Sequence, residues 1–96
     1  MNYTIPTSFK LGGHTWRVRL VKMQNQYGEC MYGTCTLLIA SHVDGVPTTP
    51  EQRYATFWHE FIHAALHTIG MDDNEQLAAG LEQMLYQLHK TARWKR

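Results

Sequence analysis

Residues 49–70 read TPEQRYATFWHEFIHAALHTIG, and this stretch predicts the first of two helices. Thr49, followed by Pro50 and then by Gln52 three residues on, has the pattern of a capping box with proline at the first helical position. Gly70 suits the left-handed conformation in which many helices end. We therefore predict a helix that begins at Pro50, extends to about residue 69 and ends at Gly70.

A second helix is expected directly after the first. Asp72, Asp73 and Asn74 are all residue types that cap a helix N-terminus well. Leucine and methionine side chains then recur at helical intervals as far as about Thr91, which predicts an apolar stripe along this helix. The stripe consists of Leu77, Leu81, Met84, Leu85 and Leu88.

The first half of the chain has the alternation of polar and apolar side chains that is typical of strands. Residues 9–11 and 15–21 flank a Gly-Gly pair, which predicts a hairpin with one face toward solvent. Residues 27–32 and 34–40 are rich in residues that favour strands and predict one or two more.

Residues 41–49 contain Asp44-Gly45 and Pro47, and such turn-forming residues predict a loop. The whole pattern predicts an α+β fold, with a small antiparallel sheet of three to four strands followed by two helices. The chain has 96 residues without a repeat or a low-complexity segment, so we expect a single domain over residues 1–96.

The composition is that of an ordinary globular protein and does not favour a strongly charged partner. Hydrophobic residues make up 44% of the chain, charged residues 18%, and the formal net charge is +1. Nucleic acid is therefore not the expected partner. The basic residues near the end are interpreted as a solvated helix C-terminus, where cations complement the helix dipole. They are Lys90, Arg93, Lys95 and Arg96.

The cysteines and the first residues favour a cytoplasmic protein. Cys30 and Cys35 are interpreted as free thiols in a strand region, because a cysteine-based zinc site would need two more ligands close by. Residues 1–10 lack the apolar segment of a secretory signal, and no stretch approaches the roughly 18 apolar residues of a membrane span. We expect no membrane partner.

Within the first helix, His59, Glu60 and His63 form the pattern H-E-x-x-H. A spacing of four places both imidazoles on one face of the helix, one turn apart, where their nitrogens can converge on one zinc ion. Glu60 then lies beside the metal, where it can take a proton from a zinc-bound water. The motif predicts a zinc centre with His59 and His63 as ligands and Glu60 as the general base.

The apolar residues of this helix are expected to bury one side, with the histidines on the opposite side. An alternative interpretation is a solvent-facing polar side without a metal. We favour the metal site, because Lys and Glu form helices better than His and are the ordinary choice for a polar face. The apolar residues are Tyr54, Phe57, Trp58, Phe61, Ile62, Ala65 and Leu66, and the histidines are His59, His63 and His67.

Catalytic zinc takes three protein ligands and one water, so a third ligand is required. His67 is not favoured, because three successive turns of one helix cannot easily close around one ion, and it is expected behind the ligands or over the cleft. Glu75 and Glu82 are seven residues apart, opposite the leucine stripe, and either can face the zinc. An antiparallel helical hairpin would bring Glu82 closer to His63, yet the linker is long enough for Glu75 to reach back. Spacing leaves both carboxylates open.

Residues 32–88 resemble the minimal zinc metallopeptidases of the gluzincin type, which include small phage and prophage proteins and the ImmA/IrrE-like peptidases. The shared elements are a Gly-containing strand, the H-E-x-x-H helix and a second helix led by Glu. The resemblance implies a zincin-like minimal catalytic core with Glu75, rather than Glu82, as the third ligand. The gap between His63 and Glu75 is shorter than is usual in ImmA/IrrE-like chains, and the helix-turn-helix often fused to them has no counterpart in this sequence.

The resemblance implies hydrolysis of a peptide bond, in which zinc polarises the scissile carbonyl and Glu60 passes the proton of the water to the leaving amine. The protein or peptide substrate is expected to extend the sheet along an edge strand, for which residues 34–40 are the candidate. One alternative is a zinc-binding module that binds a protein or nucleic acid without hydrolysis, and another is a helical interaction protein without metal. Candidate donors to the oxyanion are Tyr27, Tyr32, Tyr54 and His67.

Overall fold

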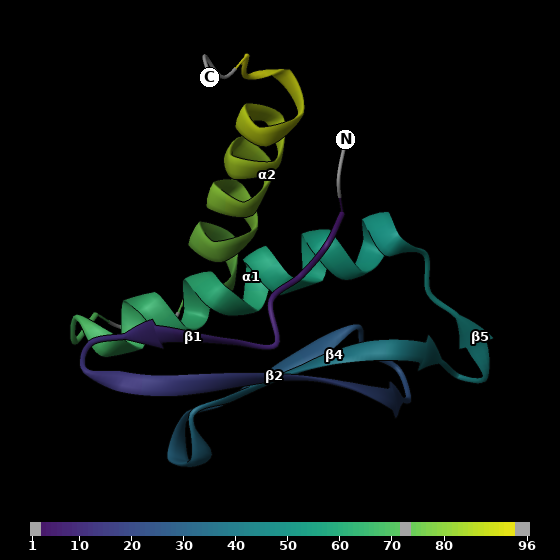
Figure 1. The fold of residues 1–96 in the computed structure, drawn as a ribbon, viewed down its shortest axis with the longest axis horizontal. Coiled ribbons are helices and arrows are strands. Elements are labelled where there is room, and N and C mark those ends of the chain that lie inside the picture. Colours follow the sequence, from purple (N-terminus) through teal and green to yellow (C-terminus); the bar gives the residue numbers. More distant parts are fainter. Residues whose placement is uncertain (1–2, 72–73, 94–96) are drawn as a thin grey trace.

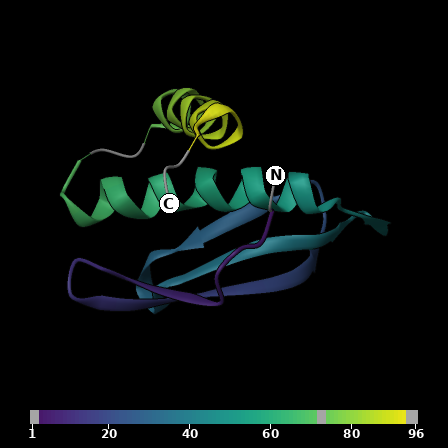
Figure 2. The same cartoon turned by 45° about the horizontal axis from the view of Figure 1, so that its top comes forward.

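A computed structural model describes residues 3–71 and 74–93 of the chain (Figure 1). A five-stranded sheet is followed by two helices, α1 (Pro50–Thr68) and α2 (Glu75–Thr91), so the predicted α+β class is confirmed. Figure 2 shows the sheet, α1 and α2 as three successive layers. The long axis of α2 crosses that of α1 at a steep angle in Figure 1. The middle layer, α1, is therefore covered on two sides.

The sheet is mixed rather than wholly antiparallel. Its strand order is β1-β2-β4-β3, with β5 beside β4. The predicted hairpin is present, since β1 pairs antiparallel with β2, but β2 and β4 run parallel. This is because β3 comes between them in sequence and lies at the edge beyond β4, so the chain reverses twice. The strands are β1 (Ser8–Leu11), β2 (His14–Met23), β3 (Gly28–Met31), β4 (Thr36–Val43) and β5 (Val46–Pro47).

The loop predicted at residues 41–49 is largely replaced by a second hairpin. β4 continues to Val43, and β5 pairs with it antiparallel after a two-residue turn at Asp44 and Gly45. Both turn residues have positive φ, 51° and 85°, the conformation that Asp-Gly favours in a tight hairpin. The loop prediction was wrong here, because it took Asp44-Gly45 as a break in structure rather than as a turn between paired strands.

α1 begins and ends as predicted. The Thr49 side chain accepts a hydrogen bond from the Gln52 N–H, and the Gln52 side chain accepts one from the Thr49 N–H, which completes the capping box. Gly70 has a φ of 76°, and the N–H groups of Gly70 and Met71 donate to carbonyls of the last helical turn. These two bonds satisfy carbonyls that the helix end would otherwise leave unpaired.

Asn74 caps α2, since its side chain accepts a hydrogen bond from the Leu77 N–H. The other predicted caps, Asp72 and Asp73, lie outside the described residues, as do Lys95 and Arg96 of the basic segment. α2 ends at Thr91, where it was predicted to end.

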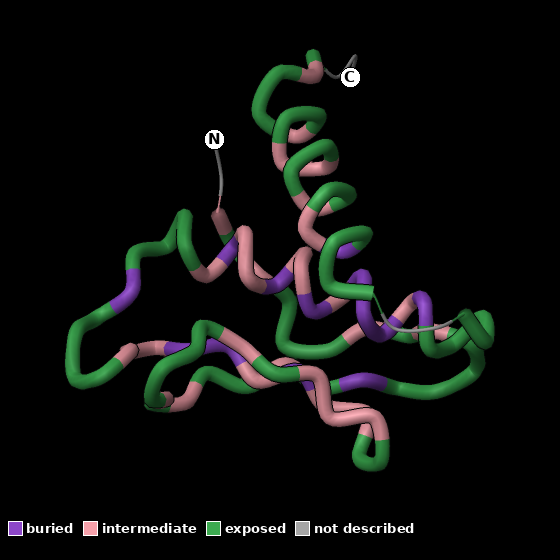
Figure 3. The backbone as a smooth tube through the Cα atoms, turned by 180° about the vertical axis from the view of Figure 1, so that it is seen from behind, coloured by how far each residue is buried: buried purple, intermediate pink, exposed green. Residues whose placement is uncertain are grey.

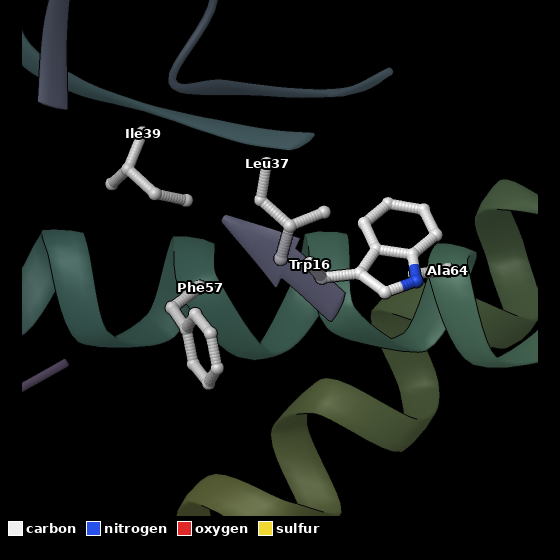
Figure 4. Packing of buried hydrophobic residues seen from close by; sticks show 5 residues of the cluster. All are labelled: Trp16, Leu37, Ile39, Phe57 and Ala64. Carbon is white, nitrogen blue, oxygen red and sulfur yellow. The ribbon is translucent and has the colours of Figure 1, made fainter. Parts of the chain in front are cut away.

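The hydrophobic core lies between the sheet and α1 (Figure 4). Leu37 and Ile39 on β4 have no exposed surface, and Trp16 on β2 lies beside them. α1 contributes Phe57 and Ala64 to this cluster. Because these two residues are seven positions apart, they define one face of the helix and fix which side chains point away from the sheet.

α2 packs on α1 through Ala78 and through one member of the predicted apolar stripe, Leu85, whereas the other four members of the stripe are exposed. Ala78 is fully buried and Leu85 partly buried against Ile62 and Leu66 of α1. Figure 3 shows that most of the tube along α2 is exposed, whereas buried residues recur along α1. The face of α2 toward α1 therefore includes the positions that follow the spacing of Ala78 and Leu85, among them Glu75 and Glu82. The exposed members of the stripe are Leu77, Leu81, Met84 and Leu88.

Candidate metal centre

The H-E-x-x-H motif lies in the middle layer, between β3 and α2. The Phe61 ring packs toward the sheet, with its centroid 5.3 Å from that of Phe9, whereas Ile62 packs toward α2. These neighbouring residues point in different directions from α1, one toward the sheet and one toward α2, and together they fix the rotation of the helix. His59 and His63 are thereby held on the remaining side, where the first turn of α2 meets α1.

The histidine side of α1 is not the solvent-facing polar side of the alternative interpretation, although it also does not lie simply opposite one buried side. His63 is only 4% exposed and Glu60 only 8%. The prediction treated α1 as a helix with one buried stripe, but a helix packed between a sheet and a second helix buries both of these sides. Of the three histidines, His67 alone is exposed.

Three side chains converge at this point: His59, His63 and Glu75. The Nε2 atoms of the two histidines are 3.3 Å apart. One carboxylate oxygen of Glu75 is 3.1 Å from the His59 Nε2, and the other is 2.9 Å from the His63 Nε2. Among the described residues, these are the three that form a group whose ligand atoms all lie within 4.8 Å of one another.

The donor set fits a catalytic zinc ion. With metal–ligand distances of about 2.0–2.1 Å, the edge of a tetrahedron between two ligand atoms is about 3.3 Å. The distances between the three ligand groups, 2.9 to 3.3 Å, lie close to that edge. Two imidazoles and one carboxylate are also a set found in catalytic zinc sites, where the fourth position stays open. The same neutral or anionic atoms would suit other divalent transition metals, so the three groups could hold a metal ion but do not identify zinc.

Glu82 lies on the other side of the same histidine. Its Oε1 is 3.6 Å from the His59 Nδ1, the ring nitrogen that faces away from Glu75. The antiparallel helical hairpin that would bring Glu82 near His63 is absent, because α2 crosses α1 steeply (Figure 1). The first turn of α2 therefore lies at the histidine pair.

His67 is separated from the three converging groups. Its ring lies against Tyr32, with the centroids 4.3 Å apart, and it lines a cavity at the far end of α1 together with His14 and Cys35. The expectation that His67 is not a ligand to the same ion agrees with this position. It contacts a residue that borders the site, since Tyr32 also lines a cavity with Glu60 and His63.

A cavity of about 440 Å³ opens beside the three converging groups. Its walls come from α1, from α2 and from the segment that leads into β3. A smaller cavity of about 240 Å³ shares Glu60 and Glu75 with it and extends along β3 toward Tyr32. Glu60 therefore borders both cavities, although its side chain is buried. The larger cavity is lined by Gln26, Tyr27, Gly28, Ala55, Thr56, His59, Glu60, Glu75 and Glu82.

Gly28 is a site residue that the sequence analysis missed. A Cβ atom at this position would lie 2.6 Å from the Thr56 Cγ2 and 3.0 Å from the Glu60 Cγ. Only glycine lets β3 and α1 approach so closely at the start of the motif. The signal was present in the sequence, because glycine within a strand often marks a close approach of the backbone to a neighbour.

The edge strand at the site is β3, not the segment 34–40. β4 (Thr36–Val43) is bonded to β2 on one side and to β3 and β5 on the other, so it lies inside the sheet. The prediction of residues 34–40 as the edge strand was wrong, because the alternation of polar and apolar residues along one strand does not reveal which strands lie beside it. β3 lies at the end of the strand order and contributes to both cavities.

The candidate oxyanion donors now divide into two groups. Tyr27 and Tyr32 line the cavities that Glu60 borders. Tyr54 lies among the rings of Tyr3, Trp58 and His89, and it is not part of either cavity wall. Cys30 and Cys35 are not joined by a disulfide.

Comparison of the chain with protein-family models, with curated proteins and with solved structures found no match in any of the three. Among the described residues, no helix has the length and apolar character needed to cross a membrane.

Proposed function

We propose that this chain is a zinc-dependent hydrolase of the metallopeptidase type that cleaves a peptide bond. The observation that carries the proposal is the convergence of His59, His63 and Glu75, whose donor groups are 2.9 to 3.3 Å apart, beside a buried Glu60. A structural zinc site is usually closed by four protein ligands, whereas three ligands beside a cavity leave a position for water. The resemblance to the gluzincin-type peptidases supports the same reaction.

A zinc ion bound there would acidify a water molecule and polarise the carbonyl that this water attacks. Glu60 is the general base, which takes the proton of the attacking water and then delivers it to the leaving amine. The Glu60 side chain is buried where α1 meets β3. The effective dielectric constant there is lower than in water, so the Glu60 charge interacts strongly with neighbouring groups. His59 and His63 contribute neutral imidazole nitrogens, and Glu75 contributes the anionic oxygen of the ligand set.

The substrate is an extended peptide segment that pairs with β3. This strand lies at the end of the strand order, next to Glu60, and an extended peptide can add to an edge strand through backbone hydrogen bonds. The cavities on both sides of Gly28 and Glu60 would take side chains of that segment. Tyr27 and Tyr32 line these cavities, and either would donate a hydrogen bond to the substrate carbonyl oxygen, which develops negative charge during attack.

The first test is metal content. Purified wild-type protein is expected to hold one zinc per chain, and His59→Ala is expected to lose it. His14→Ala is the matched control, because His14 is an exposed histidine on β2. Protein that binds no zinc in the wild type, or that keeps it in His59→Ala, would contradict the proposed site.

The second test separates catalysis from binding. Glu60→Gln is expected to keep the zinc and to abolish cleavage of a peptide library that the wild type cleaves. Glu51→Gln is the control, since Glu51 contacts Tyr86 near the start of α1. A wild-type protein that binds zinc but cleaves no member of a broad library would favour the alternative, a zinc-binding module that recognises a protein or nucleic acid.

We also propose a cytoplasmic location, in a bacterium or a phage-infected host cell. Cys30 and Cys35 are five positions apart and form no disulfide, which is typical of a reducing compartment. The phage association comes from the resemblance, and expression of a tagged chain followed by fractionation would test the location.

A further inference from the structure

The ring of His59 lies between two carboxylates. Its Nε2 is 3.1 Å from a Glu75 oxygen and 3.3 Å from the His63 Nε2, so this nitrogen faces the converging donor groups. Its Nδ1 is 3.6 Å from the Glu82 Oε1. The two nitrogens of one imidazole therefore face different acidic side chains, which both come from α2.

Glu82 is not an ordinary solvated surface residue. Its side chain is 23% exposed, close to the 21% of the His59 side chain, whereas that of Glu75 is 77% exposed. Glu82 follows Ala78 by four positions, and Ala78 is completely buried against α1. The packing of α2 thus holds the Glu82 carboxylate against the outer edge of His59. Withdrawing a carboxylate from water has a free-energy cost unless a polar partner compensates for it.

A neutral histidine that binds a metal through one nitrogen carries its proton on the other. A carboxylate at the protonated nitrogen fixes both the tautomer and the orientation of the ring. The 3.6 Å between the Glu82 Oε1 and the His59 Nδ1 is longer than a hydrogen bond, so the bond requires the two side chains to move closer together. The oxygen is placed at the edge of the ring opposite to the converging donor groups.

We propose that Glu82 is a positioning residue that accepts a hydrogen bond from the His59 Nδ1–H and thereby keeps the Nε2 lone pair directed at the metal. This assignment rests on the proposed metal centre and resolves the two acidic candidates into separate roles. Glu75 binds the ion, and Glu82 orients one of its ligands. Glu82 does not compete for the ion, because its near oxygen faces the wrong ring nitrogen.

The test that does not depend on metal is the tautomer of His59 in metal-free Glu75→Ala protein, because in the wild type the Glu75 carboxylate lies at the His59 Nε2 and would itself accept a proton from it. In this background, long-range ¹H–¹⁵N correlation spectra at a pH where the ring is neutral are expected to show the proton on Nδ1. When Glu82→Ala is added, the proton is expected to move largely to Nε2, and with Glu82→Gln, which keeps an acceptor oxygen, it is expected to remain mainly on Nδ1. Gln83→Ala changes the adjacent exposed residue and is expected to leave the spectrum of His59 unchanged.

The second measurement is zinc affinity by competition with a chelator. Loss of such an outer partner typically lowers metal affinity about 10- to 100-fold, so Glu82→Ala is expected to lie in that range and Glu82→Gln nearer to the wild type. Glu75→Ala is expected to weaken binding much more than Glu82→Ala. Thermal unfolding of the metal-free variants shows that each one is folded.

The outcomes are distinguishable. An unchanged His59 tautomer when Glu82→Ala is added to Glu75→Ala would overturn the inference, and so would an unchanged zinc affinity of the single variant Glu82→Ala, with the metal centre itself intact. If Glu82→Ala loses zinc as completely as His59→Ala while Glu75→Ala retains it, Glu82 is the ligand and the assignment is wrong. If the wild type binds no zinc but the tautomer shifts as expected, the contact between Glu82 and His59 stands while the proposed function fails.

Discussion

A Cβ atom on Gly28 would lie 3.0 Å from the Cγ of Glu60, so the edge strand β3 and the helix α1 meet at the residue proposed as the general base. The same atom would lie 3.0 Å from the Leu38 carbonyl oxygen on β4, which belongs to the sheet and cannot move freely. The space beside Glu60 therefore depends on the absence of a single methyl group. The identity of residue 28 on β3 therefore affects the position of the proposed general base on α1.

Gly28→Ala is expected to displace the Glu60 and Thr56 side chains. Overpacking of this kind destabilises a protein by about 1–3 kcal/mol. We expect the rate of peptide cleavage to fall more than the zinc affinity, because the new methyl group contacts Glu60 rather than the ligand nitrogens. Gly33→Ala is the control, since a Cβ at Gly33 meets no atom within 4 Å. Equal losses of cleavage in the two variants, measured at equal zinc occupancy, would show that the contact with Glu60 has no special role.

Zinc is expected to stabilise the folded chain. A ligand that binds only the folded state at about 100 times its Kd adds about 2.7 kcal/mol of stability. For a domain of this size, that corresponds to a rise in Tm of roughly 10–20 °C. The rise should be absent in His63→Ala and preserved in His14→Ala, as measured by calorimetry with and without a chelator. A wild-type Tm that does not respond to zinc would contradict a site formed in the folded state.

Loss of the Thr49 cap of α1 is expected to lower the free energy of unfolding. Thr49→Ala removes the hydroxyl that accepts from the Gln52 N–H, and such a loss typically costs about 1 kcal/mol. Thr49→Ser keeps the hydroxyl and should lie close to the wild type. Urea unfolding of the metal-free proteins gives the difference. If the alanine and serine variants have the same midpoint, the capping box contributes nothing measurable.

The local features of this fold could be predicted because each depends on a few adjacent residues. The capping box needs only Thr49 and Gln52, and the convergence of His59 and His63 follows from helical spacing alone. The hairpin of β1 and β2 follows from two alternating segments around a glycine pair. In each case, the interacting residues are close in sequence, so local backbone conformation is enough to bring them together.

The features that could not be predicted depend on how distant segments pack. Alternation along β4 is the same whether the strand lies at the edge or inside the sheet, so the parallel pairing with β2 was not foreseen. The choice between Glu75 and Glu82 depends on the crossing angle of α2 over α1. That angle is fixed by the contact of Ala78 with Ile62 and Leu66, which spacing within α2 does not reveal.

Ala78→Leu is therefore expected to disturb the metal centre from a distance. Ala78 has no exposed surface and lies between Glu75 and Glu82 on the face of α2 that meets α1. A larger side chain there costs about 1–3 kcal/mol and moves the first turns of α2 away from α1. Both carboxylates would then withdraw from His59, so we expect weaker zinc binding in chelator competition as well as lower stability.

Gln83→Leu is the matched control for this variant, because Gln83 is an exposed residue of the same helix and receives the same side chain. It should keep both the zinc affinity and the stability of the wild type. Ala78→Leu with unaltered zinc affinity would mean that the helix contact does not position the carboxylates. The linker and the Asn74 cap would then have to hold Glu75 at the histidine pair without help from the interface, since Asn74 is the residue that fixes the start of α2.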